Sequence, residues 1–188
     1  MRKLVVGVVA LLVGAGLNAG RAVAQTESPA FDFAIGGGVA VPLGDFDDAS
    51  KLSWHGTAAV RILPQNLPVG FQVDGNFDRL SDESAFDIKS QLIYGTGNVI
   101  YRFQTSEGTR FQPYLIGGGG VYNLDAKGDD VPTGVDSQTK FGLNAGAGFD
   151  FDVGAAALFL EGRFHNVFTD GSDTQFLPLA VGVRFGGR

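Results

Sequence analysis

The chain has 188 residues, with 20 Asp and Glu against 14 Lys and Arg, so its formal net charge is −6. This acidic balance argues against nucleic acid as a partner, because nucleic-acid binding depends on basic patches. Cysteine is absent, which excludes a disulfide framework, thiolate chemistry and a lipid-anchored cysteine.

The N-terminal segment, residues 1–24, has the pattern of a signal peptide. Arg2 and Lys3 precede an apolar stretch, residues 4–17, which falls short of the roughly 20 apolar residues that a membrane-spanning helix needs. Small residues then occupy the two positions that a signal peptidase reads, the second of which is Ala24. We therefore predict export, with cleavage after Ala24.

The remaining residues, 25–188, alternate apolar with small or polar residues at a period of two, which is the period of a β-strand. The clearest case is residues 140–153, where Phe141 and Leu143 face one way and Asn144 faces the other. The pattern predicts eight strands in one domain, at residues 31–43, 52–63, 69–80, 88–103, 112–124, 140–153, 157–168 and 177–185.

Two of these strands have an ambiguous orientation. Three consecutive apolar residues, 92–94, interrupt the alternation of the fourth strand, and a β-bulge would explain the interruption. In the fifth strand, the run of glycines at 117–120 hides the alternation. The sequence leaves open which face of these two strands points inward.

The connections between strands differ in length and charge. Residues 64–68, 104–110 and 154–156 form short turns, whereas residues 44–51, 81–87, 125–138 and 169–174 are acidic and mostly longer. Short periplasmic turns and longer outer loops are typical of bacterial outer-membrane barrels. The acidic side chains could bind divalent cations or form a solvated surface, and because no loop matches the calcium-binding pattern Asp-x-Asp-x-Asp-Gly, we favour the solvated surface.

Alternation alone does not say which face points outward, since a soluble barrel has the same period with its apolar face inside. Here the less apolar face is mainly Gly, Ala, Asn and Thr with scattered charges, which suits the narrow lumen of eight strands better than a surface in water. The sequence therefore predicts an all-β fold, an eight-stranded antiparallel up-and-down transmembrane β-barrel. Near the strand ends we expect an aromatic girdle of Trp54, Phe77, Tyr101, Phe103, Phe168 and Phe176.

Three segments, residues 31–38, 113–122 and 141–149, resemble the first, fifth and sixth strands of the outer-membrane β-barrel family that includes outer-membrane proteins A and X. The resemblance implies a small porin-like barrel, without a peptidoglycan-binding domain, in the outer membrane of a Gram-negative-type bacterium. It implies outer-membrane lipids, lipopolysaccharide and the barrel-assembly machinery as partners. The family's terminal aromatic, part of the assembly signal, corresponds to Phe185, although Gly186-Gly187-Arg188 follow it here.

Charged residues on the less apolar face are expected to pair inside the barrel, because a buried charge is costly unless it is paired. Glu161 and Arg163 share one face of the seventh strand, with Asp150 on the strand before it and Arg184 on the strand after it. Arg61 and Asp74 form a possible second cluster on the second and third strands. We interpret all six as a structural plug of ion pairs rather than as catalytic residues.

The two histidines, His55 and His165, also fall on the inward face and have no neighbouring metal-binding motif, so no cofactor or metal is expected. Lipid A deacylase, a similar small barrel, uses a His and a Ser two residues apart, and Ser53 and His55 have this spacing but point inward. We therefore expect a non-enzymatic barrel with a structural or surface-interaction role through its outer loops. Three alternatives stay open: a narrow solute channel, a lipid-modifying outer-membrane enzyme, and a soluble periplasmic barrel that binds an apolar ligand.

Overall fold

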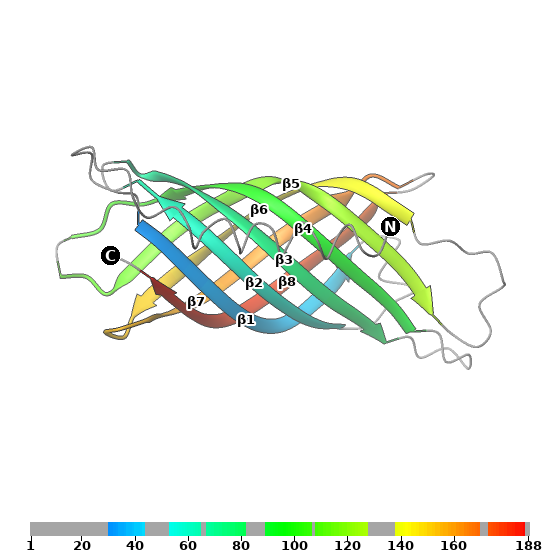
Figure 1. Cartoon of the computed structure of the whole chain (residues 1–188), viewed down its shortest axis with the longest axis horizontal. Coiled ribbons are helices and arrows are strands. Elements are labelled where there is room, and N and C mark those ends of the chain that lie inside the picture. The colour runs from blue at the N-terminus through cyan, green and yellow to red at the C-terminus, as the bar shows by residue number, and fades with distance from the viewer. Residues whose placement is uncertain are drawn as a thin grey trace, which may run out of the picture.

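The computed structural model describes residues 30–43, 53–64, 67–81, 89–106, 108–127, 138–169 and 173–186. They form eight strands: β1 (Ala30–Leu43), β2 (Ser53–Leu63), β3 (Val69–Ser81), β4 (Lys89–Arg102), β5 (Phe111–Lys127), β6 (Gln138–Asp152), β7 (Ala157–Val167) and β8 (Thr174–Gly186). Each strand pairs antiparallel with the next, and β8 returns to pair with β1, which closes the barrel (Figure 1). This confirms the predicted fold. The part of the chain that the structure describes contains no helix of the length and apolar character that a membrane crossing requires.

Strand β4 contains no bulge, so the bulge expected at residues 92–94 is wrong. Its residues pair one to one with β3 and β5 along the whole strand. Leu92 and Tyr94 are buried inside the barrel, whereas Ile93 is exposed on its outer face. The pleat is therefore regular, and the hydrophobic alternation fails only because the lumen at this level is itself lined by apolar and aromatic side chains.

The orientation of β5 follows the same register. Tyr114, Ile116 and Tyr122 are buried, and Leu115 and Val121 are exposed on the outer face. Successive residues of a strand point to opposite faces, so the glycines between them fit the same alternation. Both orientations that the sequence left open are thereby established.

The outer face of the barrel is apolar on every strand. Five of the six girdle residues expected from the sequence are exposed there, and Trp54 is 75% exposed. Phe176 is only 3% exposed and lies inside, so its assignment to the girdle is wrong. On β6 the outward residues Phe141 and Phe151 delimit a span of about 25 Å, at about 3.3 Å per residue and about 40° of strand tilt. That span matches the apolar band of an outer-membrane barrel.

The inner wall of the barrel is closely packed. A Cβ added to Gly118 would collide with the carbonyl oxygen of Gly97, and one added to Gly146 would collide with that of Gly162. A Cβ added to the outward-facing Gly75 or Gly97 would meet nothing within 4 Å. Gly118 and Gly146 are therefore required by the narrow interior, whereas Gly75 and Gly97 are not.

The short connections are turns with defined geometry. Gly108 and Gly154 have φ values of 81° and 105°, which side-chain-bearing residues rarely adopt. The β6–β7 turn is closed by a hydrogen bond from the amide of Val153 to the carbonyl of Ala156, 2.9 Å long. The longer acidic connections expected at 44–51, 81–87, 125–138 and 169–174 lie mostly outside the described residues, which leave out 44–52, 82–88, 128–137 and 170–172, and the expected signal peptide lies outside them as well.

Candidate functional site

A connected group of charged side chains fills the middle of the lumen and its short-turn end. It contains the six residues expected to pair: Arg61 on β2, Asp74 on β3, Asp150 on β6, Glu161 and Arg163 on β7, and Arg184 on β8. The regular pleat places each of them inside, and all are buried except Asp150, whose side chain is 14% exposed. We call these six residues the lumen network.

Asp150 holds the short-turn end of the lumen network. One of its oxygens lies 2.7 Å from Nη1 of Arg61 and the other lies 3.1 Å from Nε of Arg184. The guanidinium of Arg61 also lies 4.2 Å from the centre of the Tyr114 ring. The Tyr114 hydroxyl in turn donates a 2.8 Å hydrogen bond to Glu161, so strands on opposite sides of the barrel are joined across its interior.

Asp74 holds the middle of the lumen network. Nη1 of Arg163 lies 3.0 Å from Asp74, and Nε of the same guanidinium lies 2.9 Å from Glu161. The Asp74 carboxylate accepts four further hydrogen bonds of 2.6–3.0 Å, from Gln72, Asn76, Thr96 and Asn98. A buried carboxylate with this many donors has its charge almost fully compensated.

The lumen network is one group rather than two. Arg61 and Asp74, which the sequence suggested as a separate cluster, pair instead with Asp150 and Arg163. Gln72 accepts a 3.0 Å hydrogen bond from Arg61 and donates one of 3.0 Å to Asp74, which links the two parts. The reason is geometric: the lumen of eight strands is so narrow that side chains from opposite walls meet.

The lumen at the end of the longer connections is filled by rings. The rings of Tyr94 and Tyr122 are stacked with their centres 4.9 Å apart, and those of His165 and Phe176 are stacked at the same distance. The Tyr122 hydroxyl lies 2.8 Å from Nδ1 of His165. Buried Leu92 and Val167 complete this cluster, here called the aromatic layer.

Ser53 and His55 do not form a lipid-facing catalytic pair. Both are buried, and the Ser53 hydroxyl donates a 3.2 Å hydrogen bond to the carbonyl of Ala40. Nδ1 of His55 lies 2.6 Å from Asp78, also inside the barrel. Among the described residues, no group of three or more His, Cys, Asp or Glu side chains could hold a metal ion.

The outer face becomes polar at the end of the longer connections. The amide of Asn166 donates a 2.9 Å hydrogen bond to Asp173 and accepts one of 2.9 Å from Gln175. On the neighbouring strands β5 and β6, Asn123 donates a 3.2 Å hydrogen bond to Thr139. We call these side chains the polar rim, and the exposed Phe168 of the aromatic girdle lies beside it.

Sequence reasoning missed the polar partners of Asp74. Thr96 and Asn98 lie on β4, whose orientation was uncertain, and their amide and hydroxyl groups carry no charge to attract attention. A corrected parity for β4 would have placed both in the lumen beside Asp74. Phe185, the expected assembly signal, points outward on β8 and is paired in register with Phe33 of β1.

A family model described as "Outer membrane protein beta-barrel domain" matches residues 8–185. No curated protein matches the sequence.

Several solved structures have the same fold. Neisserial surface protein A is 18% identical, with 82% of this chain and 96% of that one covered and a TM-score of 0.65. Ail is the attachment invasion locus protein of Yersinia pestis, and its structure was determined in complex with the heparin analogue sucrose octasulfate. It is 18% identical over 85% of this chain and 100% of that one, with a TM-score of 0.55. OprG from Pseudomonas aeruginosa is 15% identical over 87% and 99%, also with a TM-score of 0.55.

Proposed function

This chain belongs to the outer membrane protein β-barrel domain family, and we propose that it is a non-enzymatic barrel whose longer connections act at the cell surface. The observation that carries the proposal is the packed lumen. Arg61, Arg163 and Arg184 pair with carboxylates across it, and the aromatic layer fills the other end. An interior filled in this way serves neither solute passage nor catalysis, which leaves the connections for interaction with partners.

We further propose that the short turns lie in the periplasm and the longer connections outside. Strands are assembled from the periplasmic side, so tight turns such as residues 154–156 stay there while longer segments cross. The first and last strands begin and end at the short-turn end, where Asp32 of β1 pairs with Gly186 of β8. An N-terminus on the periplasmic side fits an exported chain, so this arrangement supports the same orientation. An exported chain, cleaved after Ala24 and inserted by the barrel-assembly machinery with Phe185 as part of its signal, would have this orientation.

Lipopolysaccharide is the outer-leaflet partner that this orientation implies. The polar rim would then lie at the level of its sugars and phosphates. The amides of Asn166 and Gln175 and the exposed side chain of Arg79 offer hydrogen-bond donors at that level.

The charge of the longer connections restricts the surface partner. Residues 44–52, 82–88, 128–137 and 170–172 contain ten Asp and Glu but only one Lys and no Arg. Ail was crystallised with a heparin analogue, a sulfated and strongly anionic molecule. Like charges at an interface repel, so we propose that this barrel takes a neutral or cationic partner instead.

Surface labelling tests the proposed topology. The chain has no cysteine, so single substitutions Asp130→Cys and Ala155→Cys give a clean readout with a membrane-impermeant maleimide on intact cells. We expect labelling at position 130 and none at 155 until the outer membrane is permeabilised. Labelling at 155 but not at 130 would reverse the topology and remove the basis for a surface role.

A further inference from the structure

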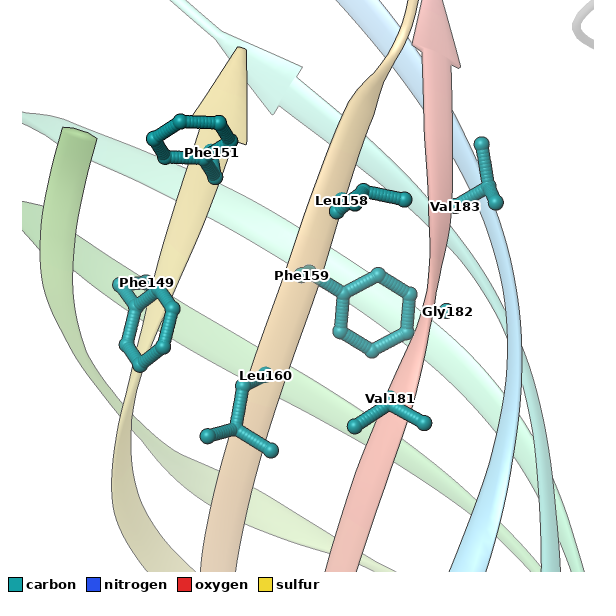
Figure 2. Close-up of a pocket in the computed structure, with 8 residues that line it drawn as sticks. All are labelled: Phe149, Phe151, Leu158, Phe159, Leu160, Val181, Gly182 and Val183. Carbon is teal, nitrogen blue, oxygen red and sulfur yellow. The ribbon is translucent and has the colours of Figure 1, made fainter. Parts of the chain in front are cut away.

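A groove crosses the outer face of the barrel near its short-turn end. It has a volume of about 440 Å³ and lies over β6, β7 and β8. Figure 2 shows the side chains that line it: Phe149 and Phe151 on β6, Leu158 and Leu160 on β7, and Val181 and Val183 on β8.

The groove follows from the strand register. Its lining forms two cross-strand rows, Phe149–Leu160–Val181 and Phe151–Leu158–Val183. In both rows the side chains become smaller from β6 to β8. The two aromatic rings of β6 therefore form one wall of the groove, and the valines of β8 form its lower part. On the far side, Val183 pairs with Ile35 of β1, whose larger side chain is exposed on the same face and raises the surface again.

The floor of the groove is closed toward the lumen. Phe159 points inward and is buried with Ala34 and Ala180, and Figure 2 shows its ring turned toward Gly182. The guanidinium of Arg184 lies 5.0 Å from the centre of that ring on the inner side. The groove is therefore a feature of the outer face alone and cannot be a pore entrance.

We propose that this groove binds one acyl chain of a phospholipid in the periplasmic leaflet. The groove is continuous with the apolar face that the barrel presents to the membrane, where Phe33, Phe71 and Phe185 are also exposed, and hydrocarbon chains are what lies against that face. The leaflet rests on the proposed orientation, which places the short turns in the periplasm.

The physical basis of binding is shape. Inside a bilayer no hydrophobic force distinguishes one apolar surface from another, so retention depends on close atomic contact. A flexible hydrocarbon chain can fill a step between aromatic rings and valines, which a flat surface does not offer. None of the six lining side chains is charged or polar, so the groove selects no headgroup.

The test is lipid retention by the purified barrel. Wild-type protein is reconstituted in nanodiscs of phosphatidylethanolamine or of phosphatidylglycerol, transferred to mild detergent and examined by native mass spectrometry. The groove is filled in a double variant, Val181→Phe with Val183→Phe. A matched control carries Val73→Phe with Val99→Phe, two outward valines of β3 and β4 that are 47% and 49% exposed, against 58% for Val181.

We expect one retained phospholipid per barrel with either headgroup, and the same in the matched control. Retention by the filled-groove variant should fall about fivefold, the loss expected when on the order of ten close atom pairs no longer form. Spin-labelled acyl chains should broaden methyl NMR signals of Leu160 and Val181 more than those of Val73 and Val99.

Several outcomes would overturn the acyl-chain proposal. They are a wild-type barrel that retains no lipid, equal loss in both variants, retention of only one headgroup type, and a wild-type dimer that the filled-groove variant disrupts. Unchanged gel migration of the unboiled variants would show that the barrel is intact. A reversed topology in the thiol labelling would move the groove to the other leaflet without removing the bound lipid, so failure of the two proposals can be told apart.

Discussion

The central position of Arg163 in the lumen network gives a quantitative prediction. Its guanidinium contacts Asp74 at 3.0 Å and Glu161 at 2.9 Å, and the residue as a whole is 3% exposed. The substitution Arg163→Met keeps much of the side-chain volume and removes the charge. Two buried carboxylates then lose their shared cation, although Asp74 keeps its amide and hydroxyl donors.

The expected cost follows from the two ion pairs that the substitution removes. A hydrogen bond to a charged group contributes about 1.5–3 kcal/mol, and breaking a buried ion pair by removing one partner costs about 3–5 kcal/mol. We therefore expect Arg163→Met to lower the free energy of unfolding by about 3–5 kcal/mol. Combining it with Asp74→Asn should recover part of this loss, with a coupling of about 1–3 kcal/mol.

The assay is reversible unfolding in urea in the presence of lipid vesicles. The chain has a single tryptophan, Trp54, which lies on the outer face, so its fluorescence reports membrane insertion. The control is Arg79→Met, which removes an exposed arginine at the end of β3 next to a longer connection and should change stability by less than about 0.5 kcal/mol. A loss below about 1 kcal/mol for Arg163→Met, or strict additivity with Asp74→Asn, would refute the view that the lumen network holds the barrel together.

Three further predictions concern the wall, the membrane and the N-terminus. Gly146→Ala should destabilise the barrel by about 1–3 kcal/mol in the same urea assay, because its Cβ would meet the backbone of β7. The control Gly97→Ala should be neutral or stabilising. Equal effects of the two substitutions would argue against a closely packed inner wall. Unboiled protein should migrate differently from boiled protein on a gel and resist carbonate extraction, since a closed barrel leaves no unpaired strand edge; extraction by carbonate would count decisively against membrane insertion. Mass spectrometry of the exported protein should find Gln25 as the first residue, and a chain that begins at Met1 would exclude signal cleavage.

Strand number, order and outer face could be predicted from the sequence because a membrane β-barrel requires apolar residues to alternate with small or polar ones along each strand. Residues such as Phe141 and Leu143 alternate with Gly142 and Asn144 over a whole strand, and only one of the two faces can meet lipid. The pattern is strongest where the lumen is polar, since the two faces then differ most.

The same reasoning failed where the lumen itself is apolar. Leu92, Tyr94 and Phe176 all belong to the interior cluster at the end of the longer connections. Their hydrophobicity suggested a bulge in one case and a girdle position in the other. Period-two patterning cannot separate an aromatic side chain inside a narrow barrel from one in the membrane interface when both faces of the strand are apolar.

Ion-pair partners were harder to assign than ion-pair members. The parity of the strands indicates that Arg61 and Asp74 point inward, but partners are chosen across the lumen, where long side chains from opposite walls meet. The link between Arg61 and Asp150, on β2 and β6, joins residues 89 positions apart. No local pattern in the sequence encodes such a contact.

Conductance of the purified barrel in a planar lipid bilayer reports directly whether the lumen network and the aromatic layer fill the interior. We expect no stable conductance from wild-type protein at any applied voltage that the bilayer tolerates. A steady, porin-sized current from pure protein would show an open lumen, contradict the packing of Arg61, Asp150 and Arg163 across it, and favour a solute channel over a surface role.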